Sequence, residues 1–166
     1  LTPSEMLSQI YTAEKDSGRK ISSIVMMGIG EPLDNYDNVI KFLNLVSCPE
    51  GNNMSLRHLS LSTCGLVDRI NDLSEHKFGL TLSISLHAAN NKQRSEIMPV
   101  NNKYDINELI SACKNYIKKT GRRISFEYAL INGVNDSRET ANELISLRRG
   151  MNCHVNISPF NKIEDR

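Results

Sequence analysis

Hydrophobic and polar residues form two patterns that alternate along the chain, one typical of helices and one typical of strands. Residues 3–17 place apolar side chains at helical spacing, with Thr2 as a suitable N-cap and Pro3 at the first helical position. Downstream, short runs rich in Ile, Val, Leu and Ser alternate with amphipathic segments. The pattern predicts strands at 22–28, 57–62, 79–86, 123–131 and 153–159, and helices at 3–17, 35–47, 66–75, 91–97, 105–119 and 137–148.

Strands that alternate with helices predict a parallel sheet with right-handed crossovers. Such a sheet is either doubly wound or part of a barrel. A complete eight-unit barrel needs roughly 250 residues, more than this chain has, so a barrel here would be partial. The serines within 59–62 and 82–85 alternate with Leu and Ile at a period of two, which directs their hydroxyls to one face, the barrel interior. The expected fold class is therefore α/β, a parallel-sheet partial (βα) TIM-type barrel, with residues 1–166 as one domain.

Four predicted strands end in small or polar residues. The carboxyl ends of parallel strands meet at one rim, where barrel folds bind small molecules. The apolar run 24–27 predicts a buried strand, and the glycines after it permit a tight turn that leaves Glu31 at the strand end. A carboxylate in this place suits an ammonium group. The alternative is a loop punctuated by Gly and Pro with a solvated Glu31.

Charge and cysteine usage narrow the function classes. The net charge of +1 gives no overall basic field for nucleic-acid binding. A local basic cluster is either solvated helix surface or an RNA contact; it comprises Lys114, Lys118, Lys119, Arg122 and Arg123. The four cysteines lie too far apart along the chain for a compact zinc or iron–sulfur motif, so we expect free, mostly buried thiols.

The sequence also bears on location and completeness. It contains no apolar stretch near the roughly 18 residues of a membrane helix and no signal peptide, which predicts a cytoplasmic protein without a membrane partner.

The chain begins at Leu1 and stops just after a predicted strand, so we expect a piece of a longer protein. Loss of a preceding strand would leave residues 22–28 with an unpaired edge, which predicts self-association or a partner strand there.

Several short motifs follow one another along nearly the whole chain. They are Met27–Leu33, Asn35–Val39, Leu61–Gly65, Ser83–Ala88, Pro99–Asn101, Glu127-Tyr128, Val134–Asp136 and Asn156–Asn161. In these motifs and in their order, the chain resembles the radical S-adenosylmethionine RNA methyltransferases. The resemblance implies S-adenosyl-L-methionine across the rim, a [4Fe-4S] cluster, and an electron donor to that cluster. The implied reaction is radical methylation of carbon 2 of adenosine in 23S ribosomal RNA and transfer RNA.

The same resemblance assigns residues. Gly30 and Glu31 would contact the methionine part of the cofactor, with the Glu31 carboxylate taking its amino group. The other implied cofactor contacts are Ser62, Ser85, Leu86, His87 and Asn161. The cluster-binding Cys-x-x-x-Cys-x-x-Cys loop would lie upstream of Leu1 and the methyl-carrying cysteine downstream of Arg166. We therefore expect no catalytic residue and no metal ligand within this chain, and no activity from it in isolation.

Alternatives remain open at this point. Within the same chemistry, the chain could belong to a carbon-8 adenosine methyltransferase or to another radical enzyme such as an activase, although Pro32 and the run 35–38 favour carbon 2. An unrelated barrel enzyme would use Glu31 and His87 as general base and acid. A non-catalytic RNA-binding module would use the basic cluster. His87 itself is either a ligand contact or a rim histidine that donates to a neighbouring backbone group.

Overall fold

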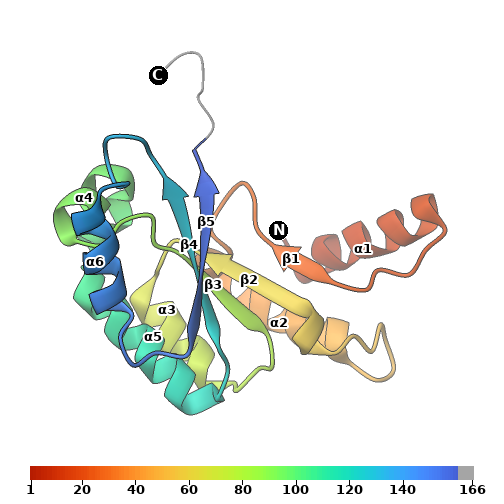
Figure 1. Ribbon diagram of the computed structural model, residues 1–166. Coiled ribbons are helices and arrows are strands. Elements are labelled where there is room, and N and C mark those ends of the chain that lie inside the picture. The colour runs from red at the N-terminus through yellow and green to blue at the C-terminus, as the bar shows by residue number, and fades with distance from the viewer. Residues whose placement is uncertain (161–166) are drawn as a thin grey trace.

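The computed structural model describes residues 1–160, which form a five-stranded parallel sheet with flanking helices (Figure 1). The strand order is β1-β2-β3-β4-β5, identical to the chain order, and every neighbouring pair is parallel. A doubly wound sheet would reverse its order part-way, so that alternative is wrong. The strands are β1 (Ile24–Met26), β2 (Leu59–Thr63), β3 (Thr81–Ser85), β4 (Ile124–Leu130) and β5 (Cys153–Pro159).

Helices connect the strands as the sequence predicts. Each predicted helix or strand is present, with its ends within two residues of the expected positions. No helix among residues 1–160 is long and apolar enough to span a membrane. The helices are α1 (Pro3–Ser17), α2 (Tyr36–Ser47), α3 (Val67–Glu75), α4 (Asn91–Ile97), α5 (Ile106–Thr120) and α6 (Arg138–Leu147), with short 3-10 turns η1 (Pro32–Asn35), η2 (Leu56–His58) and η3 (Pro99–Asn102).

Local chemistry sets the helix ends. At the start of α1 the Thr2 hydroxyl accepts from the Glu5 amide, while the Glu5 carboxylate accepts from the Thr2 amide at 2.7 Å. The helix ends at Gly18, whose φ of 65° is left-handed. These caps satisfy main-chain groups that the helix itself leaves unpaired, so a few residues decide where it begins and ends.

The two faces of the sheet differ in chemistry. Apolar strand side chains on the helix-covered face are fully buried in the core; they include Leu59, Leu61, Leu82, Ile84 and Phe126. On the opposite face the register pairs Ser62 with Ser83 and Ser83 with Ser125, which puts three hydroxyls in one row. The prediction that the serines of β2 and β3 share one face is confirmed.

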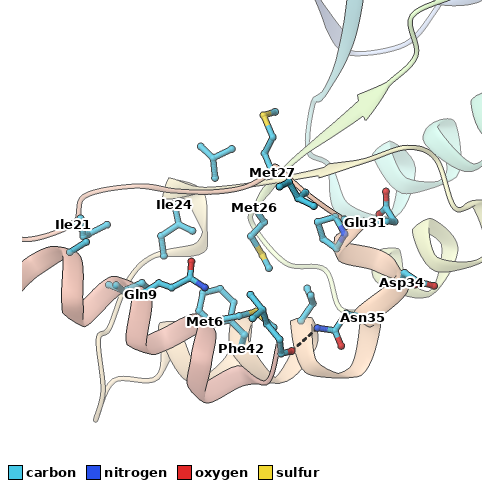
Figure 2. A pocket seen from close by; sticks show the side chains of 18 of the residues that line it. Met6, Gln9, Ile21, Ile24, Met26, Met27, Glu31, Asp34, Asn35 and Phe42 are labelled. Carbon is cyan, nitrogen blue, oxygen red and sulfur yellow. Dashed lines mark hydrogen bonds between the residues drawn. The ribbon is translucent and has the colours of Figure 1, made fainter. Parts of the chain in front are cut away.

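One expectation about β1 is wrong. The run 24–27 is not a buried strand, because Val25 is 59% exposed and Met27 is 64% exposed, whereas Ile24 and Met26 are half-buried. Among the described residues β1 pairs only with β2, and Val25 lies opposite Ser60 on the polar face. Figure 2 shows Met26 and Met27 on opposite sides of the chain, as strand alternation requires. An edge strand with one open face buries only alternate side chains.

The cysteines are free, as expected, but not mostly buried. Only Cys113 is buried; Cys48, Cys64 and Cys153 are half-buried. Their elements differ as well: Cys113 lies within α5, Cys64 follows β2 and Cys153 begins β5. The fold therefore brings no cysteine cluster together among residues 1–160.

Candidate functional site

Glu31 lies at the tip of the loop that follows β1. Its Oε1 accepts from the Leu33 amide at 3.0 Å and caps η1, and its Oε2 accepts from the Cys64 amide at 2.7 Å. The carboxylate therefore connects the tips of β1 and β2. A carboxylate offers about four acceptor positions, so this half-buried group retains capacity for a ligand donor. Figure 2 shows it directed away from Met26 and from the side chains beneath β1.

The Cys64 thiol beside Glu31 is held in its protonated form. Burial, reinforced by hydrogen bonding to the Glu31 carboxylate, raises the pKa of Cys64 to about 12. Burial also raises the pKa of Cys113 to about 12. Metal binding requires thiolates, and no group of three or more His, Cys, Asp or Glu among residues 1–160 could hold a metal ion. The described residues therefore do not fit an iron–sulfur cluster.

Arg94 is a functional candidate that the sequence analysis missed. The side chain is fully buried, with 0% exposure. Its Nη2 donates to the Cys64 carbonyl at 2.7 Å and to the Ser85 carbonyl at 3.3 Å, and its Nη1 donates to Asn101 Oδ1 at 3.2 Å. Burial lowers the pKa of Arg94 from its ordinary value. The guanidinium ties the tips of β2 and β3, and nothing in the hydrophobic pattern of α4 signals this.

His87 follows β3 in a left-handed conformation, with φ of 56°. Its amide donates to the Glu127 carbonyl at 3.2 Å, and its ring Nδ1 accepts from the Ala129 amide at 3.0 Å. Of the two alternatives for His87, the one in which the ring donates to a backbone group is therefore wrong in direction, and the proton lies on Nε2. Burial, then the Arg94 charge, lowers the pKa of His87, partly opposed by Glu127. A neutral imidazole does not favour the general-acid alternative.

Asn135 fixes His87 in place. Its Nδ2 donates to the carbonyls of His87 and Ala129, both at 2.8 Å, and its Oδ1 accepts from the Ile131 amide at 2.7 Å. The side chain is buried, and its amide is bonded through both of its polar atoms. Asn135 belongs to the motif 134–136, but only the folded chain shows that it holds the β3 and β4 tips together.

A row of polar side chains crosses the open face below these tips. The register pairs Ser85 with Glu127 and Glu127 with Asn156. Glu127 Oε1 accepts from Ser125 Oγ and from Asn156 Nδ2, each at 3.1 Å. The sequence predicts Ser85 as a site residue, whereas it marks Glu127 and Asn156 only as parts of motifs.

The remaining predicted site residues differ in their surroundings. Ser62 lies on the polar face, in the row below Ser85. Gly30 adopts φ of 104° beside Glu31, a conformation that glycine tolerates best. The Leu86 side chain is fully buried and its amide donates to the Glu127 carbonyl at 3.0 Å, so Leu86 has no free amide for a ligand. Asn161 lies outside the described residues.

A pocket of about 670 Å³ lies between α1 and β1 (Figure 2). Its walls include Met6 of α1, Met26 of β1 and Phe42 of α2, and it extends to Gly30 and Glu31. The lining is mainly apolar, unlike the row of hydroxyl and carboxylate groups across β2 to β5. This pocket adjoins the edge strand, where the sequence analysis expected unpaired backbone.

Comparison with known proteins places the fold in a family. The profile of the Radical SAM superfamily matches residues 3–145. The chain belongs to the radical SAM superfamily. A crystal structure of a radical SAM methyltransferase from Sphaerobacter thermophilus superposes with a TM-score of 0.92 at 45% identity, covering 98% of this chain and 48% of that one. A domain of pyruvate-formate lyase-activating enzyme from Bacteroides vulgatus, at 15% identity and a TM-score of 0.62, shares the fold alone.

Curated relatives are more similar to this chain in sequence than these two solved structures are. The probable dual-specificity RNA methyltransferase RlmN of Lachnospira eligens is 52% identical over 166 residues, which is 100% of this chain and 47% of the relative. A protein of the same description from Clostridium perfringens (strain 13) is 53% identical over 165 residues, or 99% of this chain and 48% of the relative. The chain therefore spans about half the length of the curated relatives it matches.

Superfamily membership implies S-adenosylmethionine and a [4Fe-4S] cluster as cofactors. The rim of this chain fits the first: it combines a half-buried carboxylate for an ammonium group with the Ser62 and Ser85 hydroxyls and the Asn156 amide for polar groups of a nucleoside. It supplies no ligand set for the second among residues 1–160. The site described here is thus suited to one cofactor of the pair.

Proposed function

We propose that the chain is the central, cofactor-binding part of an RlmN-like radical SAM methyltransferase. The parent enzyme would methylate carbon 2 of adenosine in 23S ribosomal RNA and transfer RNA, in the cytoplasm, with an electron donor for its cluster. The observation that carries the proposal is the Glu31 carboxylate at the β1 tip, bonded to the Cys64 amide beside the polar row. Identity of about half the residues over the whole chain to proteins described as RlmN supports the choice of reaction.

The cofactor residues follow from this proposal. The Glu31 carboxylate would accept hydrogen bonds from the cofactor ammonium. Gly30 has no side chain, so the cofactor would lie close to its main chain. The hydroxyls of Ser62 and Ser85 would face the bound molecule, and His87 would offer its Nε2 proton. Leu86 and Asn161 complete the set carried over from the family; because the Leu86 side chain is buried in the core, its part would be to support the rim beneath the ligand.

When bound, S-adenosylmethionine supplies the methyl group and the radical chemistry, while the protein supplies position and exclusion of water. The residues of this chain contribute orientation. Glu31 and Arg94 fix the tips of β1, β2 and β3, and Asn135 fixes the tips of β3 and β4. A rigid rim holds the ligand without reorganisation at the moment of reaction.

Titration calorimetry of the 166-residue chain with S-adenosylmethionine tests the proposal. Glu31→Gln should weaken binding about tenfold or more, because it replaces a charge-assisted bond to the ammonium with a neutral one. The matched control is Asp34→Asn, an exposed carboxylate in the same η1 turn, which should bind like the unaltered chain. Equal affinity of the two variants, or no binding by the unaltered chain, would contradict the proposal.

A non-catalytic RNA-binding module has weaker support. The basic cluster surrounds the carboxyl end of α5, and in a parallel βα fold this end lies opposite the carboxyl ends of the strands. Lys119 is paired with Glu75 of α3. Strong, salt-dependent RNA affinity of the chain with no affinity for S-adenosylmethionine would favour the module instead.

A further inference from the structure

Arg94 is the one charged side chain among the buried polar residues that the structure describes. Its hydrogen-bond acceptors are all neutral: two main-chain carbonyls and the Asn101 amide oxygen. Neither ion pair found among residues 1–160 involves it. Its Nε is buried and lacks a hydrogen-bond partner. The fold therefore holds an uncompensated guanidinium directly behind the rim.

A buried guanidinium without a counter-ion destabilises the folded state. Burial of a charge without a counter-ion costs free energy, and replacement by an apolar side chain of similar volume is often neutral or stabilising. The buried Nε–H adds a further desolvation cost. A role in the site rather than in packing explains why the position holds arginine.

The geometry connects Arg94 to the predicted ligand carboxylate. The Cys64 main chain lies between the two charges: its amide donates to Glu31 Oε2 at 2.7 Å, and its carbonyl accepts from Arg94 Nη2 at 2.7 Å. The same Nη2 reaches the Ser85 carbonyl at 3.3 Å. A Cβ on Gly65 would lie 3.2 Å from Nη2, so the turn after Cys64 closes tightly on the guanidinium.

We propose that Arg94 is a positioning residue for the amino-acid end of the S-adenosylmethionine site. It holds the Cys64 main chain, and through it the Glu31 carboxylate, at the distance that the ligand ammonium requires. Its unpaired charge also makes this part of the rim favourable for the ligand α-carboxylate, since charges in a low-dielectric interior act over several ångströms. This inference rests on the proposed function.

The nucleoside end should depend less on Arg94. His87 at the β3–β4 tips is held by Asn135 and by the Glu127 carbonyl, bonds that do not involve the guanidinium. Loss of Arg94 should therefore weaken recognition of an amino-acid group more than recognition of a nucleoside. A merely structural role would weaken both alike, so the ratio of two ligand affinities separates the two cases.

The experiment compares S-adenosylhomocysteine, which carries the amino-acid group, with 5′-methylthioadenosine, which lacks it. Arg94→Lys keeps the positive charge but cannot reproduce the bonds of a planar fork to several acceptors. We expect this variant to bind S-adenosylhomocysteine about tenfold more weakly and 5′-methylthioadenosine less than about threefold more weakly. The matched control, Arg69→Lys, alters an exposed arginine paired with Asp72 and should change neither affinity.

Asn101→Ser provides a second variant in case Arg94→Lys does not fold, as judged by thermal denaturation. It retains the guanidinium and removes the acceptor of its Nη1, so the same selective loss should appear at a smaller size. Equal losses for the two ligands, or no loss for either, would overturn the role of Arg94 and leave the proposed function standing. Failure of the unaltered chain to bind either ligand would overturn both.

Discussion

At the scale of single residues, His87 shows how the fold settles a side chain that the sequence leaves ambiguous. Its left-handed backbone, the Nδ1 bond from the Ala129 amide and the Asn135 clamp on its carbonyl all act together. The burial that lowers its pKa disfavours the charged form in the folded state. The folded protein should therefore hold a neutral imidazole near neutral pH.

His87 should make stability depend on pH. Because its folded pKa lies below the unfolded value of about 6.5, the unfolded chain binds the proton more readily. Its contribution to the free energy of unfolding is complete above about pH 6.5 and is lost as the pH falls toward the folded pKa. His87→Asn keeps a side-chain acceptor and tolerates positive φ, so it should flatten this dependence in urea denaturation between about pH 5 and 7.

The control for that measurement is His58→Asn, which alters an exposed histidine in the η2 turn. It should keep the pH dependence of the unaltered chain. An unchanged slope in His87→Asn would show that the imidazole does not titrate differently in the folded state.

At the scale of elements, the turn between β2 and α3 depends on Gly65. Its φ is 106°, and a Cβ there would lie 3.0 Å from Leu109 Cδ1. Gly30 has nearly the same φ, 104°, yet nothing lies within 4 Å of an added Cβ. The two glycines therefore differ in crowding and not in backbone conformation.

Alanine substitution at each glycine separates the free-energy cost of backbone strain from the free-energy cost of crowding. Gly30→Ala should lower the free energy of unfolding by about 1–3 kcal/mol through backbone strain alone. Gly65→Ala should lower it by a further ~1–3 kcal/mol, because α5 and the buried Arg94 must shift to accept the methyl group. Urea denaturation of both variants provides the measurement, and equal losses would show that the packing around Gly65 yields without cost.

At the scale of the whole molecule, β1 is one of the two edge strands of the described sheet, the other being β5 (Figure 1). Val25, Met27 and Ile29 are all exposed along it, and the pocket between α1 and β1 adjoins it. Unpaired strand edges with apolar side chains are templates for association. We propose that copies of the 166-residue chain associate through this edge.

Sedimentation velocity at increasing concentration should show that association. Met27→Lys should shift the chain toward monomer, because a charge beside the edge opposes strand pairing. Ile145→Lys on α6 is the matched control, since it introduces the same charge at a comparably exposed apolar side chain and should leave association unchanged. A strictly monomeric unaltered chain at high concentration would contradict the proposal.

The sequence by itself determined the order of helices and strands. Period-two and helical patterns, together with caps such as Thr2 and Gly18, act over a few residues and so can be read locally. It also indicated that polar strand ends would share a rim, because parallel strands with helical crossovers allow no other arrangement. The same pattern placed the Glu31 carboxylate at a strand end, where it suits an ammonium group, whereas the other cofactor contacts followed from the family resemblance.

Only the tertiary structure decided how those rim residues are held. The bond from Cys64 to Glu31 spans 33 positions along the chain, and that from Asn135 to the His87 carbonyl spans 48. The burial of Arg94 and the exposure of Val25 also depend on which elements pack nearby, which no local pattern records. Local periodicity encodes which face of an element is apolar, whereas desolvation and hydrogen-bond partners arise from contacts between segments remote in the chain.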